Sequence, residues 1–228
     1  MSAPAPDPSP RSTGSGRLTG VLVLAAAVTL LAGCITGERP TLGTAPTSKG
    51  TMTGDAAIDA VLTLFDTVGT ATFTAEYTGV LLFGGTSTTA TVTQDGGPTR
   101  RSVTIGSVRF ITDALGDRTC VVDTGVCNEG LQPAAVSNTG LTPEFAVGDM
   151  AKRLRRDATA KVGAATPSTR ELAGRTATCV DLPLDGGTKQ YCAFSNGALA
   201  RFVGADITID VVSISDTVDE TQFDKTAA

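Results

Sequence analysis

The feature that most limits the possible folds is a long series of short segments in which apolar and polar residues alternate. In the first of them, Phe73, Ala75 and Tyr77 alternate with threonines and a glutamate, and a period of two predicts a half-buried β-strand. Similar segments rich in β-branched residues follow, with brief turns between them, which favours an antiparallel meander over β-α-β units. The expected strands are residues 72–81, 88–93, 101–105, 108–112, 119–123, 158–165, 176–182, 188–194, 198–203 and 206–214.

Glycine-rich dipeptides and tripeptides between these segments predict the turns. They are Gly84-Gly85, Asp95-Gly96-Gly97, Asp185-Gly186-Gly187 and Asn196-Gly197. In the last segment the apolar side chains change face between Val211 and Val212. Such a change of phase predicts a β-bulge or curvature of the sheet.

A helix is expected after Asp55, because apolar residues follow at helical spacing and Gly69 suits the position just beyond the helix end. A membrane-surface role for this helix is the alternative, but its polar side lacks the lysines and arginines of such helices. A second helix is expected from Thr142 as the cap and Pro143 as the first helical residue. The apolar stripe of the first helix comprises Ala57, Ile58, Val61, Leu62, Phe65 and Val68.

The end of the second helix is basic, with Lys152, Arg153, Arg155 and Arg156 close together. These charges suit either a contact with anionic lipid head groups or the negative end of the helix dipole on a solvated face. Together the elements predict a single α+β domain over residues 54–228, in which a curved antiparallel β-sheet packs on one or two helices. Hydrophobic residues make up 41% of the 228 residues, which is enough for a sizeable core.

The N-terminus predicts export and a lipid anchor. An apolar run over residues 18–32 is shorter than the ~20 residues of a spanning helix and ends in small residues, as a signal peptide does. Its last residues, Leu31-Ala32-Gly33-Cys34, resemble the lipobox of bacterial lipoproteins. The resemblance implies a signal peptide over residues 1–33 and a lipid on Cys34. An ordinary secretory signal or an uncleaved membrane helix is the alternative. Residues 34–53 then read as a flexible tether rich in Gly, Pro and Thr.

The cysteine count agrees with export. There are five cysteines, so a lipid on Cys34 leaves four for two disulfides in an oxidising compartment. We expect the local pairs Cys120–Cys127 and Cys179–Cys192, each of which joins the two flanks of a plausible hairpin, although four cysteines allow three pairings. A zinc site with four cysteines is the alternative, but the tight spacing that such sites favour is missing.

Residues for catalysis are scarce. The chain has no His, so neither a Ser-His-Asp triad nor a metal site with histidine ligands is possible. The glycine-rich turns lack the lysine of a phosphate loop, and no Asp-rich calcium loop is present. The net charge of −5 is opposite to that of a nucleic-acid-binding surface. We therefore expect a protein that is not an enzyme, with no metal, no cofactor and no nucleic-acid partner.

The order of lipobox, tether, helix, antiparallel meander and interrupting helix resembles the LolA/LppX/LprG-like half-barrel superfamily of lipoproteins, and related periplasmic sensor domains that regulate anti-sigma factors. The resemblance covers roughly residues 54–224 and is one of element order. It implies a half-barrel sheet that wraps helices around an apolar cavity for acyl chains. Candidate cavity-lining residues, assigned from alternation, are Phe73, Tyr77, Leu81, Val103, Ile105, Phe110, Phe202, Ile207 and Ile209; filling an ordinary core is the alternative for them.

Two functions follow as hypotheses. In the first, the protein is a lipid-anchored lipoprotein on the extracytoplasmic side of the cell membrane, and it binds or carries a lipid-like amphiphile in an apolar cavity. In the second, it is a structural or signalling lipoprotein whose β-domain has no ligand cavity and binds another protein at the cell envelope.

Overall fold

The computed structural model describes residues 50–96 and 100–224. The chain divides into two units, Met1–Gly43 and Thr44–Ala228, and all described residues belong to the second. The expected signal peptide and Cys34, with most of the expected tether, therefore lie outside the described residues. Within the described ranges, no helix has the length and apolarity needed to cross a membrane.

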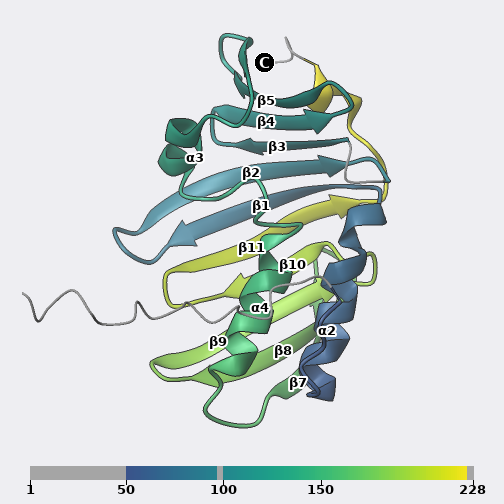
Figure 1. Ribbon diagram of the computed structural model, residues 1–228, viewed down its shortest axis with the longest axis vertical. Coiled ribbons are helices and arrows are strands. Elements are labelled where there is room, and N and C mark those ends of the chain that lie inside the picture. Colours follow the sequence, from purple (N-terminus) through teal and green to yellow (C-terminus); the bar gives the residue numbers. More distant parts are fainter. Residues whose placement is uncertain (1–49, 97–99, 225–228) are drawn as a thin grey trace, which may run out of the picture. The chain divides into compact units, whose positions relative to one another are not determined.

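One open, antiparallel sheet of eleven strands dominates the fold (Figure 1). Its order is β6-β5-β4-β3-β2-β1-β11-β10-β9-β8-β7, so the first and last strands of the meander meet in the middle. The strands are β1 (Phe73–Leu81), β2 (Thr86–Gln94), β3 (Arg101–Ile105), β4 (Val108–Asp113), β5 (Gly116–Val121), β6 (Val126–Glu129), β7 (Thr166–Leu172), β8 (Arg175–Leu184), β9 (Gly187–Phe194), β10 (Leu199–Val203) and β11 (Ile207–Ser215).

The helices are α2 (Ala56–Thr67), α3 (Pro133–Thr139) and α4 (Asp149–Thr159), with short 3-10 turns η2 (Val68–Thr70) and η3 (Glu220–Phe223). Figure 1 shows α2 and α4 crossing the half of the sheet that is built from β7 to β11. The α+β class and the antiparallel sheet are confirmed. The half-barrel shape with a cavity stays a prediction.

Helix α2 forms where the sequence predicts it. The Asp55 side chain accepts a hydrogen bond from the Ala57 N–H at 3.1 Å and so caps the helix. The apolar stripe of α2 is buried against the sheet, which explains how a helix of 12 residues is held. Gly69 lies within η2 instead of ending the helix in a left-handed conformation, so its predicted capping role is wrong.

The β9–β10 turn lies directly against α2. Gly197 has φ +82°, and a Cβ built on it would lie 2.2 Å from the carbonyl oxygen of Leu64. Glycine is therefore required at this position twice, by the backbone conformation and by the close approach of the helix.

Helix α4 begins later than the sequence predicts. Residues 142–148 form turns in which the N–H groups of Val147 and Gly148 both bond to the carbonyl of Glu144, at 3.1 and 3.0 Å. The predicted cap, Thr142, instead donates its hydroxyl to the Asp149 carboxylate. The turns bury Phe145, so an apolar residue that sequence periodicity assigned to the helix packs from a loop.

The expected strand over residues 158–165 is wrong. Helix α4 continues to Thr159, and β7 begins only at Thr166. The apolar residues at helical spacing in 150–154 extend α4 into this segment, and the alternation that follows them is too short to fix a strand start. Helix α3 and strand β6 were not predicted, because the stretch after Cys127 is polar and contains Gly130 and Gly140.

The predicted bulge is confirmed in β11. Glu76 pairs with Ser213 and Tyr77 with Val211, so Val212 is the extra residue opposite β1. Val212 is accordingly exposed. The bulge explains why the apolar phase of this strand changes along the sequence.

Candidate functional site: a pocket between two helices and the sheet

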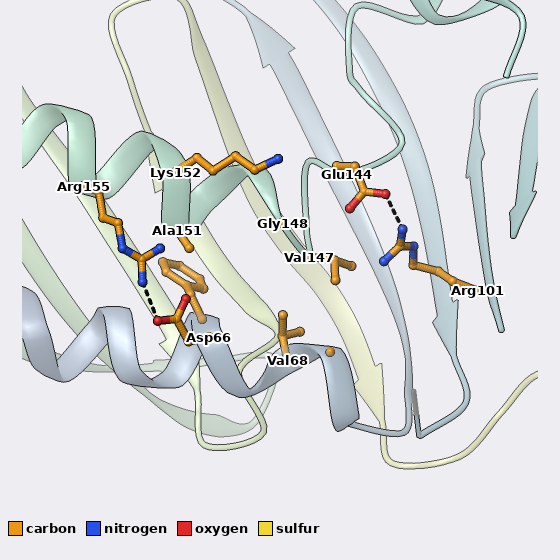
Figure 2. Close-up of a pocket in the computed structure, with 11 residues that line it drawn as sticks. Asp66, Val68, Arg101, Glu144, Val147, Gly148, Ala151, Lys152 and Arg155 are labelled. Carbon is orange, nitrogen blue, oxygen red and sulfur yellow. Dashed lines mark hydrogen bonds and ion pairs between the residues drawn. The ribbon is translucent and has the colours of Figure 1, made fainter. Parts of the chain in front are cut away.

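A pocket of about 270 Å³ lies between α2, the start of α4 and the first residue of β3 (Figure 2). We call it the helix–sheet pocket. An ion pair stands at each side, and apolar side chains lie between the two pairs. The lining residues are Phe65, Asp66, Val68, Gly69, Arg101, Glu144, Val147, Gly148, Ala151, Lys152 and Arg155.

The first ion pair joins the two helices. The guanidinium of Arg155 on α4 donates to the carboxylate of Asp66 on α2, and its Nε donates to the carbonyl of Thr51 at 2.9 Å. The same carboxylate accepts the N–H of Gly50 at 3.0 Å. Arg155 and Asp66 are both largely buried, so this pair fixes the beginning of the described chain onto α2 and α4.

The second ion pair has one buried and one accessible member. Arg101 opens β3 and is buried, whereas the carboxylate of Glu144, to which it donates, lies on the turns before α4 and is 40% exposed. A buried guanidinium needs an anionic partner. Because Glu144 is accessible and sits on a loop, it is the member of the pair that another anion can replace.

Between the two pairs the lining is apolar. Phe65 and Val68 come from the end of α2 and from η2, Val147 from the turns before α4, and Ala151 from the first turns of α4. Lys152 extends over the pocket in Figure 2, and its ammonium lies 3.6 Å from Asp149. With three basic and two acidic side chains, the lining carries a net charge of +1.

The predicted cavity-lining residues lie on one face of the sheet and pack in the core. Eight of the nine are buried, and Leu81 is partly buried against the same cluster. The hydroxyl of Tyr77 is satisfied within this core: it donates to the Leu199 carbonyl at 3.0 Å, and burial raises the pKa of Tyr77. Three members of the set, Leu81, Ile207 and Ile209, line a hollow of about 80 Å³. None of the nine lines the helix–sheet pocket.

Each of the basic residues of α4 has an acidic partner within the protein. Arg155 binds Asp66; the remaining contacts are those of Arg153 with Asp206 at 3.8 Å, Lys152 with Asp149 at 3.6 Å and Arg156 with Asp157 at 3.8 Å. The interpretation of these residues as parts of the protein's own charge network is favoured over an unpaired patch for lipid head groups.

A buried polar network anchors the end of α4. The hydroxyl of Tyr191 on β9 donates to the carboxylate of Asp157, and the Lys189 ammonium lies 2.8 Å from the same carboxylate. Burial, together with the hydrogen bond to Asp157, raises the pKa of Tyr191. The network is fully engaged in holding α4 against the sheet.

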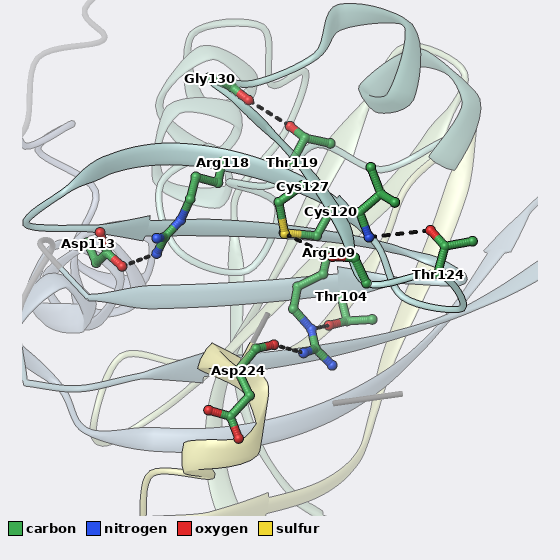
Figure 3. The surroundings of a disulfide bond; sticks show 12 residues. Thr104, Arg109, Asp113, Arg118, Thr119, Cys120, Thr124, Cys127, Gly130 and Asp224 are labelled. Atoms are coloured by element: carbon green, nitrogen blue, oxygen red, sulfur yellow. Dashed lines mark hydrogen bonds and ion pairs between the residues drawn. A yellow bond between two sulfur atoms is a disulfide. The ribbon is translucent and has the colours of Figure 1, made fainter. Parts of the chain in front are cut away.

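The structure contains the two disulfides of the local pairing, Cys120–Cys127 and Cys179–Cys192. In both, the cysteines are cross-strand partners in adjacent strands. Figure 3 shows the first with Arg109 close to it. Arg109 donates to the Thr104 hydroxyl at 3.1 Å and to the Asp224 carbonyl at 3.0 Å, and burial lowers its pKa.

Sequence reasoning missed the residues of the helix–sheet pocket. One signal was available: Arg101 shares the inward phase of Val103 and Ile105 in β3, and a charge at an inward position requires a partner. The partner itself was not readable, because Glu144 comes from a loop 43 residues away. In the described ranges no group of three or more His, Cys, Asp or Glu side chains is arranged to hold a metal ion.

No protein-family model matches the chain, and no curated protein matches it. Among solved structures, it is similar to MucB in complex with MucA(peri), at 8% identity and a TM-score of 0.49 over 73% of this chain and 59% of that chain. It is also similar to the Pseudomonas aeruginosa MucA/MucB complex, at 11% identity and a TM-score of 0.41, covering 74% of this chain and 60% of that one.

A DUF1329 family protein from Desulfovibrio piger has 10% identity and a TM-score of 0.27, covering 72% of this chain and 92% of that chain. The chain spans about three fifths of the length of the MucB chains.

Proposed function

We propose that this protein is a lipid-anchored, extracytoplasmic binding protein that takes an anionic amphiphile into the helix–sheet pocket. The observation that carries the proposal is an apolar-lined pocket with a buried arginine at one side, which pairs with an accessible carboxylate. An amphiphile has the complementary parts: an apolar chain for the lining and an anionic head group for the arginine.

The apolar lining contributes affinity but does not fix the orientation of the ligand. Burial of apolar surface contributes roughly 25 cal/mol per Å², and Phe65, Val68 and Val147 offer such surface to a ligand. A volume of about 270 Å³ is just below the ~300–1,000 Å³ of common small-molecule sites. The pocket therefore suits one small amphiphile, or the end of a single acyl chain, and not a whole diacyl lipid.

Arg101 fixes the orientation of the ligand by binding its anionic head group. A guanidinium binds carboxylate and phosphate groups through two parallel N–H bonds. When an anionic head group displaces Glu144 from Arg101, the buried positive charge remains neutralised and the released carboxylate reaches water. Lys152, whose ammonium lies 3.6 Å from Asp149 and whose side chain is 58% exposed, is a second basic group at the rim. The pair between Arg155 and Asp66 is too buried to exchange and has the structural role.

Binding without conversion is part of the proposal. The chain has no His, and both carboxylates of the pocket are bonded to arginines. When a ligand binds, Asp66 stays bonded to Arg155, and the proposal assigns no proton transfer to the Glu144 carboxylate that the ligand releases into water.

Anchoring is also part of the proposal, on the sequence alone. The apolar run and the sequence Leu31–Cys34 support lipidation of Cys34, and the disulfides support an oxidising compartment. Replacing Cys34 by Ala should abolish incorporation of a palmitate analogue. Continued labelling of the C34A protein would show that the anchor is elsewhere.

The pocket is tested by titration with a fluorescent fatty acid. Because hydrogen bonds to charged groups contribute about 1.5–3 kcal/mol, Arg101→Gln should lower the affinity by about ten- to a hundredfold. Arg118→Gln is the matched control, since Arg118 forms a similarly buried pair with Asp113 outside the pocket. Equal affinities for the two variants would remove Arg101 from the site.

A protein-binding role is the second candidate, and the packed core favours it. Most of the predicted inward residues fill the interior, and among the described strands β6 and β7 are the two edges of the sheet. Free edges can add a strand from a partner. Native mass spectrometry of the protein purified from its own membrane separates the candidates: a bound amphiphile supports the pocket, and recovery of the ligand-free mass alone favours the protein partner.

A further inference from the structure

The turn between β1 and β2 presents two large apolar side chains to solvent. Leu82 is 52% exposed and Phe83 is 83% exposed. The other described phenylalanines are buried or partly covered; Phe223, for example, lies under the guanidinium of Arg100, 4.3 Å from the ring centroid. Phe83 thus differs from the other described phenylalanines in that most of its side chain faces solvent.

The backbone holds this tip in place. Strands β1 and β2 pair over nine consecutive residue pairs up to Leu81 and Thr86. The Leu82 N–H donates to the Asp206 carbonyl at 2.9 Å, which ties the tip to the β10–β11 turn. Gly84 and Gly85 have φ +90° and +63°, so the turn depends on glycine. The two side chains therefore project from a built hairpin.

The hairpin is free of charge around its tip. Residues 77–94, which include all of β2 and most of β1, contain no Asp, Glu, Lys or Arg. A charge close to the tip would oppose insertion into lipid, and Thr and Ser side chains are compatible with the hydrated head-group layer. The hairpin itself can therefore enter a bilayer interface without burial of one of its own charges. Asp206, which is tied to the tip through its backbone carbonyl, has a side chain that is 56% exposed and lies 3.8 Å from Arg153, so insertion is confined to the Leu82 and Phe83 side chains.

The size of the tip distinguishes a bilayer from a protein partner. A stable protein–protein interface buries about 800 Å² per partner, and two side chains at a narrow turn supply only a fraction of that. Insertion into lipid needs no complementary surface, and burying one Leu or Phe side chain changes a partition coefficient by roughly tenfold or more. We propose that Leu82 and Phe83 insert into the interfacial layer of a lipid bilayer and orient the domain on it.

The antiparallel order defines which part of the domain then faces the bilayer. The β5–β6 turn lies at the same end of the strands as Phe83, and there Val121 and Val126 are also exposed. The β4–β5 turn lies at the opposite end, where Leu115 is 84% exposed. Leu115 is therefore an equally exposed position that the proposal directs away from the bilayer.

A tryptophan at each position gives the test, because the chain contains none. The full chain with Phe83→Trp, and the full chain with Leu115→Trp, are placed in phospholipid vesicles with brominated acyl chains. We expect the emission of the first to shift to shorter wavelength and to be quenched by bromine. The second should keep the emission of a tryptophan in water. Both positions are exposed, and circular dichroism checks that both variants are folded.

A third protein, L82D/F83W, tests whether the apolar character of the tip causes insertion. The ratio of quenched to unquenched tryptophan should fall by about tenfold or more relative to F83W. Emission without quenching in F83W overturns the proposal, as does equal quenching in F83W and L115W. A blue shift without quenching also overturns it, because it means that a protein surface covers the tip.

Discussion

The buried pair between Arg155 and Asp66 yields an asymmetric prediction for stability. Replacing Asp66 by Ala leaves a guanidinium that is 2% exposed, with the Thr51 carbonyl as its remaining acceptor. Removing one member of a buried pair costs about 3–5 kcal/mol, so we expect a loss in this range. Replacing Arg155 by Met leaves a carboxylate that is 14% exposed and still accepts the Gly50 N–H. Because this carboxylate retains a donor and reaches water, we expect a smaller loss of about 2–3 kcal/mol.

The double variant D66A/R155M measures the interaction energy between the two side chains. With both charges removed, the loss in free energy of unfolding should be smaller than the sum of the two single losses by about 1–3 kcal/mol. Urea unfolding followed by circular dichroism gives the free energies, provided that the slope of the transition is unchanged. The same measurement in high salt should give the same losses, since a buried pair is weakly screened.

A surface pair serves as the control. Arg175 and Asp216 lie 2.7 Å apart, and their side chains are 33% and 65% exposed, so Arg175→Ala should cost less than about 1 kcal/mol. If Asp66→Ala costs no more than Arg175→Ala, or if the order of the two single losses is reversed, the reasoning from burial is refuted.

Three further predictions concern stability. Gly197→Ala should cost about 2–4 kcal/mol, from its positive φ and the contact with the α2 backbone, whereas Gly186→Ala, with positive φ and open space, should cost about 1 kcal/mol in the same urea assay. Removing the Cys179–Cys192 disulfide should cost about 3 kcal/mol on the loop-entropy account for a separation of 13 residues; thermal unfolding of the double Ser variant measures it. A hydrogen bond from the Lys161 ammonium lowers the pKa of Asp55 below 3.8. The stabilisation that the Asp55 carboxylate gives to the folded state is therefore present above about pH 4 and is lost as the pH falls through the folded-state pKa. Asp55→Asn should flatten the loss of stability in acid, and an unchanged profile of stability against pH would contradict this.

The sequence predicts nine of the eleven strands, all except the edge strands β6 and β7, because the signals for those nine are local. Alternation in β1 and the change of phase at Val212 both follow from the side-chain period of a strand and from no distant contact. The start of α4 fails for the opposite reason. Thr142 is a good helix cap by type, but its hydroxyl binds Asp149, and the backbone turns at Glu144 decide where the helix begins.

The pocket is less predictable than the sheet because its parts are far apart in the chain. Asp66 and Arg155 come from different helices, and Glu144 reaches Arg101 from a loop. Inward phase identifies Arg101 as a buried charge, but only the crossing of α2 and α4 over the sheet makes a pocket beside it. Alternation likewise finds inward residues such as Phe73 and Phe110 without distinguishing a filled core from a cavity.

The two proposed surfaces lie at opposite ends of β1. Phe73 pairs with Gln94, which pairs with Arg101 at the pocket, whereas the other end of β1 leads into Phe83. Nine strand residues separate the ends by about 30 Å. A domain oriented by its tip therefore holds the pocket away from the bilayer, so an amphiphile bound at Arg101 is out of contact with the membrane. Since sites this far apart usually act additively, Phe83→Ser should leave the fatty-acid affinity unchanged, and Arg101→Gln should leave the quenching of F83W unchanged.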